Sequence, residues 1–277
     1  MKTPTIRVIR IEAGDDPRLA DYAGVREPAL LRDRGLLIAE GRFVVRRLLG
    51  ASRARLLSLL LNDAALNGLG DVLGQVAVDL DVYVASPEVI TAATGFNMHR
   101  GCLALAERPA ALSVEALLGA SQFVAVLERV VDPDNVGSVF RNAEAFGAEA
   151  VLLSPGCCDP LYRKSLRTSS AAALMVPFAL ATPWPQALDD LRTAGFTVVA
   201  MTPGDGSIDI GAFVRRAEAR EKLAVLLGTE GDGLTSEALA HVDVRVRIPM
   251  GSGVDSLNIA TAAGIALHRL SEARTPG

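Results

Sequence analysis

Residues 123–146 read FVAVLERVVDPDNVGSVFRNAEAF, and the expected fold of the chain follows from this stretch. The apolar run 123–127 predicts a buried strand, and residues 136–146 have the apolar spacing of a helix. The turn DPDN lies between them, and the side chain of Asp134 or Asn135 is expected to cap the helix by accepting a free backbone N–H. A strand that passes through a tight turn into a helix is a building unit of α/β folds.

The same alternation continues towards the C-terminus. The remaining strands of this region are expected at 150–153, 198–201, 223–227 and 244–248, and helices at 236–242 and 257–270. These strands are nearly continuous apolar runs, which is typical of a parallel sheet that is covered by helices on both faces. We therefore expect an α/β domain with a mostly parallel sheet.

A smaller α/β unit is expected before this domain. Strands predicted at 36–39, 55–61, 81–84 and 101–105 alternate with helical patterns, the first of them at 41–49. Pro109 interrupts this alternation and marks a hinge. The sequence therefore predicts a first domain at 1–108, a linker at 109–120 and a larger domain at 121–277.

Composition limits the possible classes of protein. Of the 277 residues, 50% are hydrophobic and 22% are charged, so the chain can bury a sizeable core and global disorder is excluded. The formal net charge is −4, so any contact with nucleic acid must use a local basic patch. Three cysteines exclude a disulfide framework and favour a reducing compartment. The N-terminus lacks the apolar core of a signal peptide, and no apolar run could span a bilayer, so we expect a cytoplasmic protein without a membrane partner.

Two later segments combine the end of a predicted strand with a glycine-rich turn. Residues 226–234 read LLGTEGDGL, and residues 247–260 read RIPMGSGVDSLNIA. Open parallel sheets bind their ligands at the carboxyl ends of the strands. A tight turn needs glycines but no carboxylate, which makes Glu230 a candidate functional residue. Ser256 and Asn258 are expected in the first turn of a helix that starts near residue 255 or 256, where they either cap the helix or contact a ligand.

Taken together and in this order, three segments resemble the motifs of the SpoU (TrmH-type) RNA 2′-O-methyltransferases. They are NVGSVFRNA at 135–143, GTEGDG at 228–233, and the residues IPM and SLNIA within 248–260. LIAEG at 37–41 and MHRGCLA at 98–104 are similar to the L30e-like substrate-binding domain that is often fused to this catalytic domain. The resemblance implies methyl transfer from S-adenosyl-L-methionine to a ribose 2′-hydroxyl of rRNA or tRNA. It also implies a trefoil knot in the C-terminal domain and a homodimer formed through that domain.

The resemblance also assigns roles to individual residues. Arg141 matches the catalytic arginine of the family, Asn135 matches the motif-one asparagine beside it, and Glu230, Ser256 and Asn258 match the other polar motif positions. The predicted cofactor-binding positions are Thr202, Pro203, Gly228, Gly231, Ile248, Met250 and Leu257. An arginine is a poor general base because its pKa lies above about 12. We therefore favour a clamp on the substrate phosphate over a deprotonated Arg141, although both mechanisms fit the motif.

An arginine cluster in the first domain is the candidate RNA-binding surface. Its members are Arg26, Arg32, Arg34, Arg42, Arg46, Arg47, Arg53 and Arg55, and only Glu27, Asp33 and Glu40 oppose them. Guanidinium groups can bind phosphates with two hydrogen bonds, but such a cluster is also compatible with a solvated helix face. The predicted RNA contacts are Arg42, Arg46, Arg47, His99, Arg100 and Arg163.

Two other functions fit parts of the pattern. The arginine cluster alone would suit a non-catalytic RNA-binding or ribosome-assembly protein, and the three motifs would suit a methyltransferase that acts on a base nitrogen or a small molecule. The three histidines, His99, His241 and His268, lack metal-ligand spacing, so no metal is expected.

Overall fold

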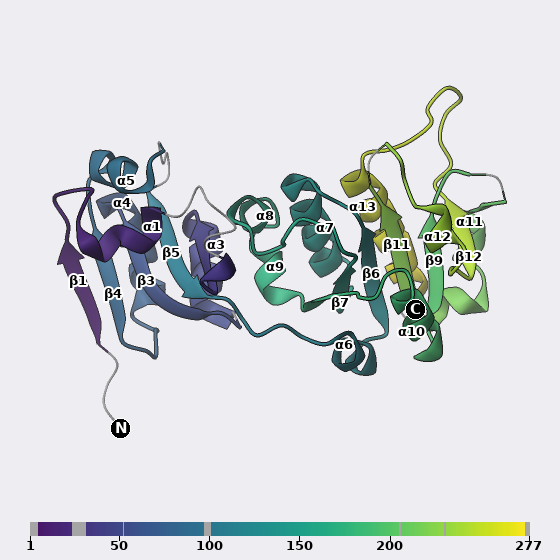
Figure 1. Ribbon diagram of the computed structural model, residues 1–277, viewed down its shortest axis with the longest axis horizontal. Helices are drawn as coiled ribbons and strands as arrows, with labels where there is room; N and C mark the ends of the chain where they lie inside the picture. The colour runs from purple at the N-terminus through teal and green to yellow at the C-terminus, as the bar shows by residue number, and fades with distance from the viewer. Residues whose placement is uncertain are drawn as a thin grey trace. The chain divides into compact units, whose positions relative to one another are not determined.

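Two compact units make up the computed structural model, which describes residues 5–23, 32–51, 53–96, 101–204, 206–229 and 231–274 (Figure 1). The first unit comprises Met1–Ala110 and Leu161–Met175, and the second unit comprises Ala111–Pro160 and Val176–Gly277. The sequence-based division placed residues 161–175 in the C-terminal domain, whereas the structure groups them with the first unit. It also forms a helix, α6 (Val114–Ala120), where a linker was expected, because Ser113 caps it through a hydrogen bond from the Ala116 N–H.

A parallel sheet forms the second unit, and in the described residues its seven strands follow the order β10-β12-β9-β11-β6-β7-β8 (Figure 1). All the pairings of this sheet are parallel, as predicted. The strands are β6 (Phe123–Glu128), β7 (Ala150–Leu153), β8 (Phe178–Leu180), β9 (Thr197–Met201), β10 (Ile208–Asp209), β11 (Leu223–Gly228) and β12 (Val244–Arg247).

Helices cover this sheet because its strands are apolar on both faces. The helices are α6, α7 (Pro133–Ala145), α10 (Ala187–Thr193), α11 (Ile210–Phe213), α12 (Ser236–Leu239) and α13 (Ile259–Arg274), with a 3-10 turn η3 at Ala217–Arg220. Leucines of α6 and α10 pack with Val124, Val126 and Leu226 in one core cluster. α7 and α13 pack against each other, and they also contact β7 and β11 respectively. The central strands β6, β7, β9 and β11 are almost fully buried, so a ligand site on them is expected at their carboxyl ends.

The start of α7 differs from the prediction. Asp132, not Asp134 or Asn135, is the N-cap, and its Oδ1 accepts hydrogen bonds from the backbone N–H groups of Asp134 and Asn135 at 2.7 and 3.1 Å. Pro133 decides this position, because proline fits the first turn of a helix, where its missing N–H is not needed. Asn135 therefore lies within the helix, and its side chain is available for another contact.

A mixed sheet forms the first unit, in the order β1-β4-β3-β5-β2. Its strands are β1 (Ile6–Arg10), β2 (Leu36–Glu40), β3 (Arg55–Leu61), β4 (Leu80–Val84) and β5 (Cys102–Glu107), and β5 is antiparallel to both β2 and β3. Its helical segments are η1 (Pro17–Leu19), α1 (Ala20–Ala23), α3 (Arg42–Ala51), α4 (Asp63–Leu73), α5 (Pro87–Thr94), α8 (Arg163–Thr168) and α9 (Ala172–Met175). In the core, the hydroxyls of Tyr22 and Ser58 are hydrogen-bonded at 2.9 Å. Across the described parts of both units, no helix has the length and apolar character needed to cross a membrane.

Candidate active site

The carboxyl ends of four neighbouring strands bring the predicted motifs to one edge of the second unit. β12, β9, β11 and β6 are adjacent and parallel, so the residues that follow them emerge on the same side. Gly228, the last residue of β11, is the register partner of Glu128, the last residue of β6. Motifs that lie about a hundred residues apart in the chain thus start from neighbouring strand ends, as the parallel-sheet prediction requires.

A hydrogen bond between two asparagines joins the first motif to the third. Asn258 Nδ2 donates to Asn135 Oδ1 at 3.1 Å, while Asn258 Oδ1 accepts from the Ala260 N–H at 2.9 Å and so caps α13. Asn135 is 9% exposed, so this contact lies at the edge of the core. Ser256 is exposed and precedes the helix, because α13 starts at Ile259 and not near residue 255 or 256.

Close approach of α7 and α13 supports this contact. Asn142 Nδ2 donates to the Ala260 carbonyl at 2.8 Å, and a Cβ added at Gly264 would lie 3.3 Å from Asn142 Nδ2. A larger residue at position 264 would push the helices apart. The small residue Gly264 and the Asn142–Ala260 hydrogen bond therefore seat motif three against the helix that carries Arg141.

Arg141 projects from the middle of α7 and is exposed, while Val139, Phe140 and Ala143 of the same helix are buried. The guanidinium makes no hydrogen bond or ion pair with any residue that the structure describes. It lies six residues after Asn135, which corresponds to about 9 Å along the helix axis. A guanidinium without a structural partner is free to bind a substrate.

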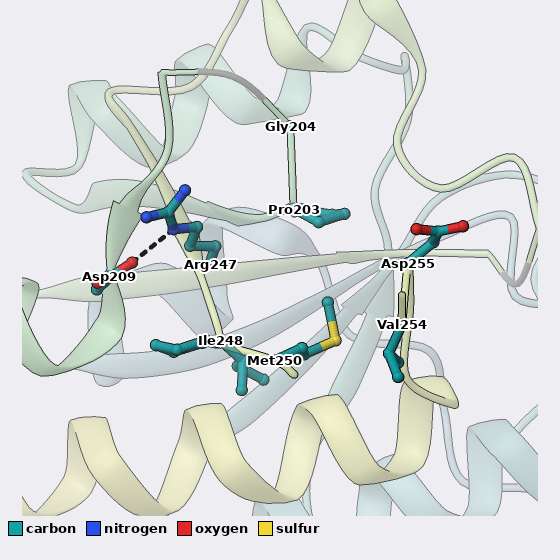
Figure 2. A pocket seen from close by; sticks show the side chains of 9 residues that line it. Pro203, Gly204, Asp209, Arg247, Ile248, Met250, Val254 and Asp255 are labelled. Carbon is teal, nitrogen blue, oxygen red and sulfur yellow. Dashed lines mark hydrogen bonds and ion pairs between the residues drawn. The ribbon is translucent and has the colours of Figure 1, made fainter. Parts of the chain in front are cut away.

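A pocket of about 570 Å³ opens beside the ends of β9 and β12 (Figure 2). Three of the predicted cofactor-binding residues, Pro203, Ile248 and Met250, line it, and Figure 2 shows the Met250 side chain extending into the space between Pro203 and Val254. The other lining residues were not predicted: they are Gly204, Asp209, Arg247, Pro249, Val254 and Asp255, with Arg247 Nε donating to Asp209 Oδ1. Asp209 ends β10 and Arg247 ends β12, and their opposite charges are the feature of the sequence that could have indicated this ion pair.

The glycine-rich turn after β11 is tightly closed. A Cβ at Gly228 would lie 2.6 Å from both the Gly233 carbonyl oxygen and the Leu234 nitrogen, so only glycine fits there. Gly231 and Gly233 have φ values of 88° and 69°, in the left-handed region that favours glycine. Glu230 lies outside the described residues. Thr202 follows β9, and Leu257 precedes α13, so both belong to the same strand-end region although neither lines the pocket.

Glu128 is a buried carboxylate that the sequence interpretation missed. It is 1% exposed, and its Oε1 accepts hydrogen bonds from Trp184 Nε1 at 2.9 Å and Thr235 Oγ1 at 2.7 Å. Its Oε2 accepts from the Thr235 N–H at 2.9 Å. Glu128 thus ties the end of β6 to the residues that follow the glycine-rich turn. The signal that could have found it is an acidic residue at the end of an otherwise apolar strand.

The predicted RNA-binding residues lie in the first unit. Arg46 pairs with Asp71, Arg163 pairs with Glu40, and Arg47 donates to the Ser170 carbonyl at 3.0 Å. Arg42 is exposed and has no hydrogen bond or ion pair among the described residues. Arg26, His99 and Arg100 lie outside the described residues.

Known proteins resemble the chain over most of its length. The model of the SpoU rRNA Methylase family matches residues 122–268. An uncharacterized tRNA/rRNA methyltransferase of Mycobacterium tuberculosis (strain ATCC 25618 / H37Rv) is 44% identical over 258 residues, which are 92% of this chain and 88% of that protein.

Solved structures match the whole fold. A crystal structure of an RNA 2′-O ribose methyltransferase has a TM-score of 0.78 at 27% identity, and the match covers 96% of this chain and 99% of that one. An AdoMet-bound rRNA methyltransferase from Sinorhizobium meliloti has a TM-score of 0.78 at 23% identity over 96% of this chain and 98% of that one, which shows a shared fold. The family match covers the three motifs and the site that they build, and the chain belongs to the SpoU rRNA methylase family of RNA methyltransferases.

Proposed function

We propose that the protein transfers the methyl group of S-adenosyl-L-methionine to a ribose 2′-hydroxyl of rRNA or tRNA. The observation that carries the proposal is the Asn258–Asn135 hydrogen bond, which seats the third motif on the helix of Arg141. The structural neighbour described as an RNA 2′-O ribose methyltransferase supports the same acceptor.

The pocket beside β9 and β12 fits the cofactor. Its volume of about 570 Å³ lies within the range of small-molecule sites, roughly 300–1,000 Å³. Pro203, Ile248 and Met250 supply apolar walls, and Asp209 and Asp255 supply carboxylates that could accept hydrogen bonds from hydroxyl or ammonium groups. When bound, S-adenosylmethionine supplies a methyl group on a positively charged sulfur, which an oxygen nucleophile attacks. Thr202, Gly228, Gly231 and Leu257 would complete the surroundings of this pocket.

Arg141 would bind the phosphate next to the target ribose and stabilise negative charge on the attacking oxygen. This role needs a protonated guanidinium, which is its ordinary state, and the proton of the hydroxyl would pass to water or to the phosphate. Asn135 and Asn258 hold the start of α7 and the start of α13 in a fixed relation, and Glu230 and Ser256 are the further polar residues proposed to act on the substrate. The same proposal assigns RNA binding to the first unit through Arg42, Arg46, Arg47, His99, Arg100 and Arg163.

Transfer of tritiated methyl groups from S-adenosylmethionine to unmodified rRNA and tRNA tests the proposal. Alkaline digestion of the product should leave labelled dinucleotides, because a 2′-O-methyl group blocks cleavage of the adjacent phosphodiester. Arg141→Ala should reduce transfer at least a hundredfold without loss of cofactor binding. Arg269→Gln, which removes an exposed arginine of α13, should behave as wild type. Label that is recovered only in mononucleotides would refute the ribose as acceptor, because a methylated base leaves the 2′-hydroxyl free and the adjacent phosphodiester cleavable.

The knot and the homodimer implied by the family resemblance are part of the same proposal. The second unit would form the dimer interface. Sedimentation equilibrium of the full chain at micromolar concentration should give twice the mass of 29.1 kDa, and a monomer would contradict the dimer.

A further inference from the structure

A strained residue lies at the edge of the proposed active site. Among the described residues, Arg129, Ser170 and Ala171 are the non-glycine residues with positive φ, and Arg129 has φ 54°. Residues other than glycine and asparagine are unfavourable in this left-handed region, because their Cβ approaches the following carbonyl oxygen. Such strain persists only where the surroundings impose it, and it concentrates at functional sites.

The turn at Arg129 is fixed on both sides. Before it, the buried carboxylate of Glu128 holds its three hydrogen bonds. At the turn itself, the Arg129 N–H donates to Ser154 Oγ at 2.9 Å. After it, Val130 is 2% exposed, and its carbonyl accepts from the Cys158 N–H at 2.8 Å. The backbone therefore cannot relax to a better φ, and only a change of residue would relieve the strain.

The side chain of Arg129 contributes nothing visible to the fold. It is exposed and forms no hydrogen bond or ion pair with the residues that the structure describes. Glycine would suit this backbone better, so stability does not explain the arginine. The arginine is therefore better explained by its chemistry, because its positive charge and planar set of N–H donors suit a phosphate group.

The position of Arg129 indicates which phosphate it would meet. The residue before it is the register partner of Gly228, where the glycine-rich turn begins, and Asp132, the N-cap of α7, lies three residues after it. Arg129 thus follows the strand end beside motif two and precedes α7 in the chain, and its Cγ would lie 4.0 Å from a Cβ added at Gly156, in the turn after β7. Arg129 and Arg141 therefore lie on either side of the start of α7 in the chain, and both are exposed.

We propose that Arg129 binds a backbone phosphate of the RNA beside the target nucleotide, and that the left-handed backbone directs its side chain there. This inference rests on the proposed function, because it needs an RNA substrate at the same edge of the sheet. Arg129 would act in binding only, so its loss weakens the affinity for RNA and leaves the affinity for S-adenosylmethionine unchanged.

The test compares Arg129→Gly, Arg129→Lys and the control Arg269→Gln. Binding to a short fluorescein-labelled single-stranded RNA is measured by anisotropy over a range of salt concentrations. Arg129→Gly should bind more weakly, and the slope of log K against log salt should fall by about 0.7, the value for one phosphate contact on a single strand. Arg129→Lys should keep the wild-type slope because it keeps the charge, and Arg269→Gln should keep both slope and affinity. The urea midpoint of Arg129→Gly should equal or exceed that of wild type, which rules out unfolding as the cause.

Each outcome bears on a definite claim. An Arg129→Gly protein with wild-type slope and affinity would overturn the inference while wild-type methyl transfer still supports the proposed function. Wild-type protein that binds the RNA but transfers no methyl group would overturn the proposed function while the loss of slope still supports a phosphate contact. Wild-type protein without measurable affinity for this RNA would overturn the inference, whereas methyl transfer to rRNA and tRNA would still decide the proposed function.

Discussion

Replacement of Glu128 by glutamine should destabilise the second unit and weaken cofactor binding together. In the wild-type protein the carboxylate accepts three hydrogen bonds, of which two come from Thr235 and one from Trp184. Glutamine can present its oxygen to Trp184 Nε1 and Thr235 Oγ1, but its amide nitrogen then faces the Thr235 N–H. One hydrogen bond is lost, and two donors oppose each other in a site that water does not reach.

The structure sets the size of the effect. A buried donor that loses its acceptor costs about 1–3 kcal/mol. Glu128→Gln leaves one such donor, so we expect a loss of about 2 kcal/mol in the free energy of unfolding. Glu128→Ala leaves both the Thr235 backbone N–H and the Trp184 indole N–H without an acceptor, and it also opens a cavity. The free energy of unfolding should therefore fall by about 4 kcal/mol. Trp184→Phe removes a single donor and leaves the carboxylate paired with Thr235, so it should cost about 1 kcal/mol.

Urea denaturation followed by circular dichroism measures these differences, and calorimetry measures the affinity for S-adenosylmethionine. The affinity should fall in the same order as the stability, because Thr235 follows directly on the glycine-rich turn that begins at Gly228. Thr235→Ser keeps the hydroxyl and the N–H and is the matched control. A Glu128→Gln protein with wild-type stability would refute the reasoning, since it would show that the carboxylate is not needed to hold the three donors.

Three further outcomes follow from single contacts. Gly228→Ala places a methyl group 2.6 Å from the Gly233 carbonyl oxygen, so it should cost about 1–3 kcal/mol in urea denaturation and reduce cofactor affinity in calorimetry; wild-type values would contradict the closed turn. Asn258→Asp keeps the acceptor that caps α13 but loses the donor to Asn135, so methyl transfer should fall about tenfold or more while the thermal midpoint changes little. Burial raises the pKa of the Cys102 thiol to about 12, so iodoacetamide at pH 8 should label it only after unfolding, as read by mass spectrometry.

Strands that are buried on both faces were the most predictable part of the fold. The runs 55–61 and 150–153 agree with β3 and β7 at both ends, because each is a nearly continuous apolar run; β7 is buried throughout, and β3 is buried from Ser58 onwards. β8 (Phe178–Leu180) and β10 (Ile208–Asp209) were not predicted, since two or three residues carry no period. β1 (Ile6–Arg10) was also missed, because on this edge strand exposed and half-buried residues mix.

The helix ends were less predictable from the local sequence than the strands. Three residues in the turn DPDN can cap a helix, and the choice among them depends on where proline is tolerated, which selects Asp132. For α13, Asn258 rather than Ser256 accepts the first free N–H, so the helix begins later than its composition suggests. In both places the sequence indicates a cap within a few residues; Pro133 settles the choice for α7, and for α13 the capping residue Asn258 also contacts Asn135.

The location of the site can be predicted from the sequence only to the extent that the order and direction of the strands can. The predicted parallel order is confirmed, and it brings the ends of β6, β9, β11 and β12 to one edge, where the residues after each strand emerge. No spacing rule states that Asn258 must meet Asn135, because that contact depends on how closely α13 can approach α7, and Gly264 against Asn142 sets this distance. The same holds for Glu128, whose three donors come from segments that are remote in the chain. Motif recognition therefore identifies candidate residues for a ligand, whereas the residues that hold those motifs in place become visible only when the helices and turns are packed.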